Sequence, residues 1–500
     1  MTAPVLTNDT LDQWRAALSD PRSVAQLRKA GINVATGLTF FDLRAPAQTQ
    51  YPVLTPLRNV IPRRPGRGGP AVNWKVTRAI NTTSVPAGVA EGHRNAVISL
   101  SVLPFVRAYV GLGMENNATF EARYAGENFE DVDSLASLTA LQSLMIAEEQ
   151  LIIGGNNSLA LGTTPTPTAV ASTTGGTIPT ATAVSVICVA LTPDGLRRAS
   201  LASGVVQTIA RTSAAGEVDT VNGGTAQKSA AGATSATTTS TSSVGASVAP
   251  VVGAAGYAWF AGTAGAEKIA AITTINSVVI TALPASGQTA ASLTSTDNSQ
   301  DALVFDGLMT FAADTSHNGG YYKQLATGTA GTGTTLTADG ANGIKELNDL
   351  FSFYWDPFRL SPDVIYVNAQ EMNTITNIVV ANGGSPMLRL TMAANGGDGK
   401  ISAGVQVSEV LNKITGKKVA VEVHPYVPAG TIISYIKNLP AGTYQGYNPG
   451  STLEMDTRQE YYQLQWPLKT RQREFGVYVD EVLVPWASFA FGAISNIAHS

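Results

Sequence analysis

One long stretch of this 500-residue chain is nearly free of charged side chains. Residues 163 to 296 hold nine Asp, Glu, Lys or Arg, whereas 14% of the whole chain is charged. Thr, Ala, Ser and Gly dominate the stretch, and no Met occurs between Met145 and Met309. Structureless loops of this length are uncommon inside compact domains, so the change in composition predicts a separate domain inserted into another. The two flanks must then fold together as one discontinuous body.

Composition narrows the classes of protein to consider. The length predicts two or three domains, and 44% hydrophobic residues supply material for their cores. A net charge of −4 argues against a protein whose main task is to grip nucleic-acid phosphates. The single Cys188 excludes an internal disulfide framework or a multi-Cys metal site, and its apolar neighbours predict a buried strand thiol. Without a secretory signal or a long apolar run, we expect a soluble protein made in the cytosol.

The first 110 residues predict an arm followed by a hairpin. Leu11, Trp14 and Leu18 recur at helical spacing within residues 10 to 19, but that apolar face is too small to fold alone. Six prolines between residues 31 and 70 indicate an irregular, extended arm. Two β-rich runs then flank a stretch containing Gly and Pro, which is typical of a long hairpin. Pro104 in the second run indicates an edge strand, because proline cannot donate to a ladder, and we expect the hairpin to project.

A long helix is predicted from about residue 132 to 153. Asp131 or Asp133 can cap its start, and Gly154 with Gly155 would supply a left-handed stop. At 1.5 Å per residue the helix would be roughly 33 Å long, which suits a structural spine. The residues expected along one of its sides are Leu135, Leu138, Leu141, Met145, Glu148 and Ile152.

The charge-poor stretch itself predicts a small antiparallel β-sandwich. Its β-prone runs are short and separated by Gly, Ser and Thr clusters, without helical periodicity. Residues 229 to 247 are of low complexity and are expected to form a mobile loop. The runs that predict strands are AVSVICVALT, GYAWFAG and SVVITALP.

Helix and strand alternate after residue 297, so the predicted class of the flanks is α+β. ANGIKELNDLFSFYW predicts a helix capped near Asp339 or Asn342, and PDVIYVNAQEMNTITNIV a strand that leads into a helix. VAVEVHPYVPAGTIISYI predicts a strand, a turn and a strand, and the C-terminal tail two or three more strands.

No constellation of catalytic or metal-binding residues stands out. The four histidines, His424 among them, lack a second ligand at zinc spacing and are expected to be structural or solvated. NGGDGKIS at 395 to 402 departs from a phosphate loop, and GGSPM at 383 to 387 departs from a nucleophile elbow. Glu148 and Glu149 point about 100° apart on a helix and do not converge, so we interpret them as helix surface and packing. The sequence therefore predicts no enzyme, no cofactor and no metal.

The most basic patch contains Arg58, Arg63, Arg64 and Arg67, interleaved with Pro and Gly. It would contact an acidic neighbour or phosphate, or it would be a solvated loop. Both readings stay open, and a protein partner is favoured over nucleic acid. The candidate assembly contacts are these four arginines with Trp74 and Glu91.

Taken together, the hairpin, the long helix and the C-terminal strands resemble the major capsid protein family of tailed bacteriophages. The likeness covers roughly 1 to 162 and 297 to 500. The strings that carry it are NWKVTRAINTTSVPAGVAEG, DVDSLASLTALQSLMIAEEQLIIGG, ALVFDGL, SPDVIYVNAQEM and YVDEVLVPWASFAFG.

The resemblance implies a domain plan for the whole chain. An N-terminal arm would cover residues 1 to 55, and an extended loop made of the hairpin 56 to 114. A peripheral domain with the spine helix would combine 115 to 162 with 410 to 500, and an axial domain would cover 297 to 409. The charge-poor stretch, 163 to 296, would be an immunoglobulin-like or fibronectin type III-like insertion.

The chain departs from the family's pattern in two places. Some members cross-link their shells through a Lys near the loop tip, but here no Lys lies between Lys75 and Lys323 except Lys228 and Lys268. Covalent cross-linking is therefore not expected. Some members also carry a cleaved scaffolding segment before the arm. No such segment stands in this sequence, so we expect either a separate scaffolding protein, or none, or a chain that is already processed.

The predicted function is that of a structural protein, not an enzyme. An arm, a projecting hairpin and a thin helix cannot bury their apolar faces within one subunit, so they should do so between subunits and close into shells. The expected product is an icosahedral phage head of hexamers and pentamers around double-stranded DNA, built in a bacterial cytoplasm. Expected partners are a portal and scaffolding or cement proteins, with weak DNA contact and no membrane. An encapsulin-like compartment shell is the first alternative, and a surface adhesin with immunoglobulin-like modules the second.

Overall fold

The computed structural model divides into two compact units along the chain. The first unit combines Met1–Val53, Glu115–Ala140 and Leu464–Gly476, and the second holds the rest. The described residues are 51–66, 68–127, 131–213, 215–234, 236–314, 320–381, 406–444, 446, 449–468 and 470–499, with the backbone alone at 32–35 and 38–41. The helix predicted at 10 to 19 and the motifs at 383 to 387 and 395 to 402 lie outside these residues.

The first unit holds a short hairpin of β1 (Ile32–Ala35) and β2 (Leu38–Phe41), and helix α4 (Phe120–Gly126). Thr119 caps α4, since its hydroxyl accepts the Ala122 N–H at 3.2 Å. Phe475, Ala118 and Ala136 form its small apolar core. Asp133 accepts ion pairs from Arg123 at 3.2 Å and Arg473 at 3.1 Å.

Helix α5 spans Val132–Gly154, which confirms the predicted helix. Asp131 caps it, because its carboxylate accepts the N–H groups of Asp133 at 3.1 Å and Ser134 at 3.4 Å. The predicted side is right at Glu148 and Ile152, which are buried, and wrong at Leu138, which is 49% exposed. The side that is buried repeats every four residues: Ala136, Ala140, Leu144, Glu148 and Ile152.

The two glycines at the end of α5 do not act as a left-handed stop, because neither has a positive φ. They allow close packing instead. A Cβ on Gly154 would lie 2.4 Å from the Cβ of Pro193, and one on Gly155 would lie 2.2 Å from the backbone oxygen of Phe305. The predicted stop is therefore wrong, and the need for glycine comes from partners far along the chain.

A six-stranded mixed sheet forms the main core of the second unit, and the α+β class is confirmed. The strands predicted around the 424 to 431 turn are β19 (Lys418–Val423) and β20 (Ile432–Tyr435). They do not pair with each other, because β17 (Val364–Val367) lies between them. Helix α8 begins without a side-chain cap, so Asp339 and Asn342 do not cap it as predicted. The order of the sheet is β16 (Tyr321–Gln324), β23 (Phe491–Ser495), β20 (Ile432–Tyr435), β17 (Val364–Val367), β19 (Lys418–Val423) and β18 (Glu409–Leu411), and the helices of this region are α7 (Leu308–Ala313), α8 (Lys345–Phe358) and α9 (Ala369–Ala381).

A second sheet has the order β3 (Arg63–Pro65), β21 (Leu453–Gln465), β22 (Gln472–Pro485) and β6 (Val110–Thr119). Strand β3 pairs parallel to β21, with Arg63 opposite Met455. A short helix, α3 (Pro56–Val60), precedes it. The prediction of an irregular arm up to residue 70 is therefore wrong for residues 56 to 65.

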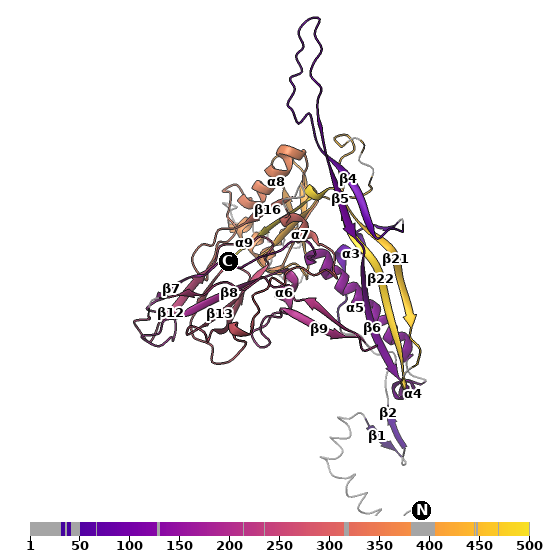
Figure 1. Ribbon diagram of the computed structural model, residues 1–500, viewed down its shortest axis with the longest axis vertical. Helices are drawn as coiled ribbons and strands as arrows, with labels where there is room; N and C mark the ends of the chain where they lie inside the picture. Colours follow the sequence, from indigo (N-terminus) through magenta and orange to yellow (C-terminus); the bar gives the residue numbers. More distant parts are fainter. Residues whose placement is uncertain are drawn as a thin grey trace, which may run out of the picture. The chain divides into compact units, whose positions relative to one another are not determined.

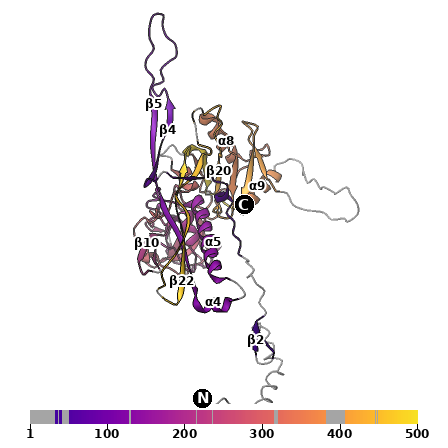
Figure 2. The same cartoon turned by 90° about the vertical axis from the view of Figure 1, so that its right-hand side faces the viewer.

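Strands β4 (Ala71–Ile80) and β5 (Leu100–Ala108) form the predicted hairpin, side by side in both views (Figures 1 and 2). Pro104 lies opposite Lys75 in this two-stranded sheet, where each strand has a free edge. Trp74 and Phe105 stack on the inner face with ring centroids 5.3 Å apart. The outer face exposes four large apolar side chains, from Ile80, Leu100, Val102 and Val106. The loop between the strands, residues 81 to 99, is exposed along most of its length.

The charge-poor stretch folds into two larger antiparallel sheets and one strand pair. Cys188 is fully buried in β8 (Ser185–Leu191), as predicted. Its burial raises the pKa of the Cys188 thiol. The loop predicted at 229 to 247 is wrong in part, since β12 is the central strand of its sheet and buries Val244 and Ala246. The sheets are β11 (Gly232–Ala233), β8 (Ser185–Leu191), β13 (Gly256–Gly262) and β14 (Lys268–Thr273); β15 (Ser277–Ile280), β12 (Ser243–Ser247) and β7 (Thr168–Ser172); and the pair β9 (Thr208–Thr212) and β10 (Val218–Asn222), with a short helix α6 (Pro193–Arg198).

Candidate functional site: the anchor at the base of the hairpin

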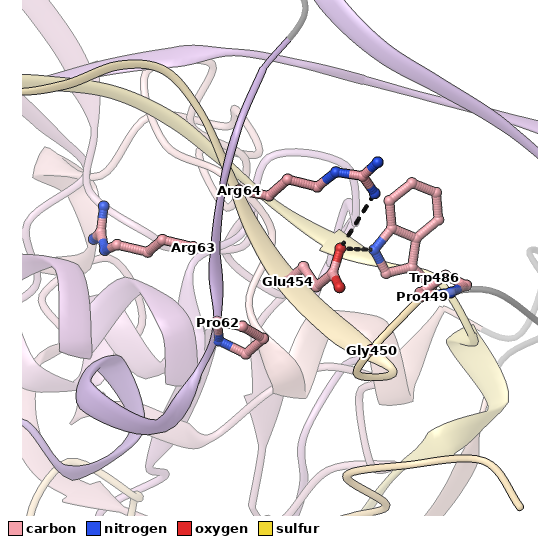
Figure 3. Close-up of a pocket in the computed structure, with 7 residues that line it drawn as sticks. All are labelled: Pro62, Arg63, Arg64, Pro449, Gly450, Glu454 and Trp486. Atoms are coloured by element: carbon pink, nitrogen blue, oxygen red, sulfur yellow. Dashed lines mark hydrogen bonds and ion pairs between the residues drawn. The ribbon is translucent and has the colours of Figure 1, made fainter.

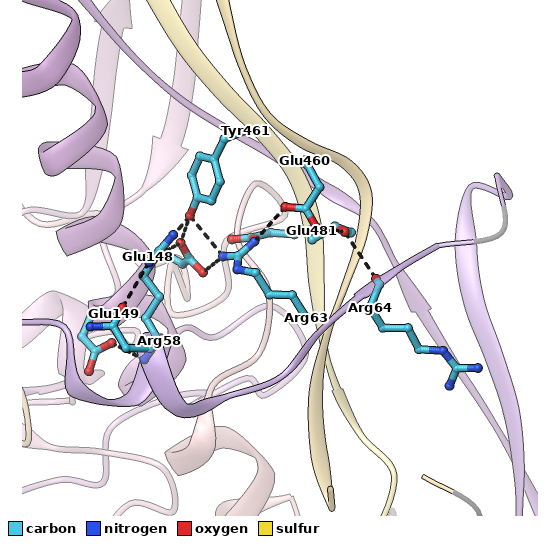
Figure 4. Close-up of polar contacts among 10 residues, drawn as sticks. Arg58, Arg63, Arg64, Glu148, Glu149, Glu460, Tyr461 and Glu481 are labelled. Carbon is cyan, nitrogen blue, oxygen red and sulfur yellow. Dashed lines mark hydrogen bonds and ion pairs between the residues drawn. The ribbon is translucent and has the colours of Figure 1, made fainter. Parts of the chain in front are cut away.

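The predicted assembly residues that the structure describes lie in the second unit, some of them buried and others exposed. Arg58 and Arg63 point into the protein, whereas Arg64 lies on the surface with 47% of its side chain exposed (Figure 4). Trp74 is buried in the hairpin, and Glu91 is exposed in the loop at its far end. Arg67 lies outside the described residues.

Glu149 of α5 binds the start of α3. Its two carboxylate oxygens accept the backbone N–H groups of Leu57 at 2.9 Å and Arg58 at 2.7 Å. The first turn of any helix has N–H groups without partners inside the helix, so this carboxylate supplies a cap from a distant part of the chain. The interaction favours a carboxylate further, because the N-terminal end of a helix carries partial positive charge.

His424 completes the surroundings of Glu149. Its Nε2 lies 2.6 Å from a carboxylate oxygen of Glu149, and its Nδ1 accepts the Tyr426 N–H at 3.2 Å. Since Nδ1 is an acceptor, the ring proton belongs on Nε2, which donates to Glu149. Both side chains are fully buried. The histidine is therefore structural, one of the two roles that the sequence predicted for it.

Glu148 binds the side chains of the same segment. One oxygen accepts Arg58 Nε at 2.8 Å, and the other pairs with Arg63 (Figure 4). The Tyr461 hydroxyl from β21 also donates to Glu148, and its ring lies 5.1 Å and 4.9 Å from the Arg58 and Arg63 guanidinium carbons. Arg63 reaches Glu481 of β22 at 3.0 Å as well. We call these five side chains, Arg58, Arg63, Glu148, Tyr461 and Glu481, the anchor cluster.

Burial controls the electrostatics of the anchor cluster. Burial lowers the pKa of Arg63, but the charges of Glu481 and Glu148 more than compensate, so the net pKa is raised. Burial first, and then the charge of Glu148, raise the pKa of Glu481. Charges held in a buried site need close partners, so the cluster tolerates little change in geometry. The residues that precede the hairpin are thereby held against α5, β21 and β22.

Of the two roles predicted for Glu148 and Glu149, helix surface and packing, the surface role is wrong, because both side chains are buried and bonded. They do point to different partners, as adjacent helix residues must. The sequence contains one signal for their role: two consecutive acids within the apolar run LMIAEEQLII. Their partners could not be predicted, since they lie as far away as His424 and Tyr461.

A cavity of about 520 Å³ lies on the other side of β3 (Figure 3). Arg64 lies over the Trp486 ring, 5.9 Å from its centroid, and 3.7 Å from Glu454. The Trp486 Nε1–H donates to Glu454 at 2.8 Å, which fixes the orientation of the ring. Pro62, Pro449 and Gly450 complete the lining, together with the backbone side of Arg63.

No group of three His, Cys, Asp or Glu residues that could hold a metal ion occurs among the residues that the structure describes. Over those same ranges, no helix is both long and apolar enough to cross a membrane.

No protein-family model and no curated protein matches the sequence. Among solved structures, the capsid of Myoviridae Phage XM1 is similar at 10% identity and a TM-score of 0.41, over 93% of this chain and 99% of that one. The capsid of a native GTA particle is similar at 8% identity and a TM-score of 0.40, over 93% and 98%. The holo-SrpI encapsulin complex from Synechococcus elongatus is similar at 10% and 0.33, over 91% and 94%. The structural neighbours of this chain thus include capsid and encapsulin proteins.

Proposed function

We propose that this chain is a shell-forming structural protein, the major capsid protein of a tailed-phage head. The observation that carries the proposal is the hairpin β4–β5. Its outer face and loop expose Ile80, Leu100, Val102 and Val106, together with Val97, whose side chain is 91% exposed. A two-stranded hairpin is marginally stable in water by itself, and exposed apolar surface of this extent indicates an interaction site.

A contact with further copies of the same chain satisfies this need. The hairpin differs from the surface that it would cover, so the contact is heterologous, and repetition of a heterologous contact closes into rings. Hexamers and pentamers of an icosahedral head are such rings. The anchor cluster supports the proposal, because a projecting element can make a repeated contact only if its base is held in one direction.

The finer features of the proposal come from the sequence. The contents would be double-stranded DNA, touched weakly by a chain with a net charge of −4. A portal, and scaffolding or cement proteins, would be further partners in a head assembled in a bacterial cytoplasm. The domain boundaries and the immunoglobulin-like character of residues 163 to 296 remain proposals, and no catalytic role is proposed.

Electron microscopy of the purified chain tests the proposal. We expect closed shells, or separate rings that close when scaffolding partners are added. A chain that stays monomeric under all assembly conditions, with and without such partners, would contradict it. The encapsulin-like alternative predicts shells of the same kind that carry an enzyme cargo in place of DNA, which mass spectrometry of purified particles would detect.

A further inference from the structure

Most sheet edges of the second unit are protected against pairing with another chain. An edge strand presents unpaired backbone N–H and C=O groups, and proteins protect such edges with charged side chains, with proline, or by covering them. Eight edge strands of this unit carry a charged residue. These residues include Arg64 on β3, Lys75 on β4, Arg107 on β5, Arg211 on β9, Asp219 on β10, Lys268 on β14, Lys323 on β16 and Glu409 on β18.

Strand β7 is an edge without such protection. It lies beside β12 (Figure 1) and contains neither a charged residue nor a proline. The backbone of its five residues makes no hydrogen bond to any residue outside β12 that the structure describes. The opposite edge of the same sheet, β15, is covered, since the Gly331 N–H donates to the Ser277 hydroxyl at 3.1 Å. The other uncharged edge, β11, has only two residues.

The strands around β7 are free of charge as well. All nine charged residues of the stretch 163 to 296 fall within 194 to 228 or at 267 and 268. Strands β7, β12 and β15 therefore contain none. The centres of protein interfaces are depleted of charged residues, and Val170 in the middle of β7 is 64% exposed. An apolar side chain on an open, uncharged edge favours the addition of a strand from another molecule.

The sequence of β7 matches its own reverse. Its five residues read as hydroxyl, Ala, Val, Ala and hydroxyl in both directions. In an antiparallel pair centred on Val170, Val170 lies opposite Val170 of the other copy. Ala169 then lies opposite Ala171, and Thr168 opposite Ser172. Opposed hydroxyl side chains can hydrogen-bond across the strands, and the two valines bury apolar surface against each other, so β7 is a suitable partner for itself.

We propose that β7 pairs antiparallel with β7 of a second copy, in the register centred on Val170. Two three-stranded sheets then become one six-stranded sheet around a two-fold axis. The contact is isologous, because both copies contribute the same surface. The low charge of residues 163 to 296 gains a physical reason, since like charges at such a contact would stand opposite each other and repel.

The role of this contact rests on the proposed function. A heterologous contact builds a ring, and a two-fold contact between copies in adjacent rings joins one ring to the next. The β7 pair adds to the contacts that the flanks make. Shells should therefore form without it and come apart more easily.

Cysteine cross-linking tests the register. Directly opposed residues of an antiparallel pair have Cα atoms about 4.5–5.5 Å apart, which a disulfide can span. Assembled Val170→Cys particles should give a covalent dimer on mild oxidation and no larger multimer, because a two-fold contact joins copies only in pairs. The natural thiol, Cys188, is fully buried and does not compete.

Thr168→Cys is the matched control. In the proposed register the Thr168 positions of the two copies are four residues apart along the strands, roughly 13 Å. This variant should give less than a tenth of the dimer, and Thr168→Cys combined with Ser172→Cys should restore it. No dimer from Val170→Cys, or as much dimer from Thr168→Cys alone, would overturn the pairing.

Charge substitution supplies a second measurement. Val170→Lys and Val170→Glu should each lower the fraction of shells that survive a urea challenge at least threefold, since like charges would face each other. Shells assembled from both variants together should survive better than shells of either alone. Val218→Lys, at a position of the β10 edge that is 66% exposed, is the control and should change survival less than twofold. Mixed shells that survive no better would contradict the contact.

The assays separate the inference from the function. Normal shells that give no Val170→Cys dimer would overturn the β7 pair and leave the capsid function in place. A chain that gives the dimer but forms no shell or ring under any condition would overturn the capsid function and leave the β7 pair in place.

Discussion

Individual carboxylates hold the segment that precedes the hairpin. Glu149 caps a helix through two backbone N–H groups, and Glu148 neutralises Arg58 and Arg63. Neither role depends on neighbours in sequence, because the nearest of these partners is 85 residues away. A single side chain can therefore control the position of an element that is remote along the chain.

Glu148→Ala should destabilise the unassembled chain strongly. It leaves Arg58 and Arg63 half-buried with fewer partners, and removal of one partner of a buried pair costs about 3–5 kcal/mol. Chemical denaturation would measure the loss. Glu460→Ala is the matched control: this side chain is 54% exposed and 3.7 Å from Arg63, and exposed pairs contribute about 0–1 kcal/mol. Equal losses for the two variants would contradict the role of the anchor cluster.

Glu371 in α9 should make stability depend on pH. Burial raises its pKa to about 7, and one carboxylate oxygen has no hydrogen-bond partner among the described residues. The folded state then holds the proton up to a higher pH than the unfolded chain does, with its ordinary pKa of about 4.3. Stability is thus greatest below pH 4.3 as far as this group is concerned, and falls as pH rises through 7.

Glu371→Gln should remove this dependence, because the amide is neutral at every pH. At pH 8 the variant should be more stable than the wild type by roughly 1–3 kcal/mol, as measured by denaturation between pH 5 and 8. Glu422→Gln, at an exposed position of β19, should leave the profile unchanged. A Glu371→Gln profile parallel to that of the wild type would show that Glu371 does not titrate in this range.

Among the elements, α5 shows how packing, and not local periodicity, selects a buried side. Its mixed composition offers apolar residues on all sides. Ala136 is buried in the small core with Ala118 and Phe475, and Ile152 is buried in the main core. Its end is decided in the same way. Gly155 packs against the backbone of Phe305, and the Gly155 N–H donates to Leu151 in a regular helical turn.

Gly155→Ala should therefore be destabilising although alanine favours helices. The added Cβ would lie 2.2 Å from a backbone oxygen. Overpacking of this kind lowers the free energy of unfolding by about 1–3 kcal/mol. Gly88→Ala in the hairpin loop is the control, because a Cβ there meets no atom within 4 Å. Thermal unfolding would compare the two. If Gly155→Ala unfolds at the wild-type temperature, the close approach does not constrain this position.

At the scale of the whole molecule, residues 163 to 296 have their own apolar cores but are also bonded to the flanks. Around Val186 and Trp259 one core gathers side chains of this stretch, together with Leu161 just before it. Polar contacts also leave the stretch: Asn276 exchanges hydrogen bonds with Asn496 at 2.8 Å and 3.0 Å, and Tyr322 accepts the Gly253 N–H at 2.9 Å.

Deletion of residues 165 to 294 should leave a chain that folds and assembles but unfolds at a lower temperature. The ends of the stretch lie close together, since the Gly162 N–H donates to Asp297 at 2.8 Å, so a short Gly linker can join them. The Asn496 side-chain oxygen would lose the Asn276 N–H, although its amide group still donates to the Leu325 carbonyl. An unsatisfied buried polar group costs about 1–3 kcal/mol.

Electron microscopy and thermal unfolding of the deletion variant would check both expectations. Asn496→Ala in the full chain removes both hydrogen bonds to Asn276 while the stretch stays in place, and so separates the loss of this contact from the loss of the stretch. A deletion variant without any soluble rings would show that the stretch belongs to the core of the fold.

The sequence by itself determined the local elements. Two β-rich runs predicted the hairpin of β4 and β5, Asp131 or Asp133 the start of α5, and the apolar neighbours of Cys188 a buried strand, because period, capping and burial are properties of neighbouring residues. The low charge of residues 163 to 296 marked a region of its own for the same reason.

Only the tertiary structure decided how these elements are used. It made Glu148 and Glu149 an anchor, turned Arg63 inward and Arg64 outward, placed β17 between β19 and β20, and gave Gly155 its role. Each of these depends on a partner tens to hundreds of residues away. Such partners are brought together by the burial of apolar surface, which is not directional, and therefore leave no pattern in the sequence around them.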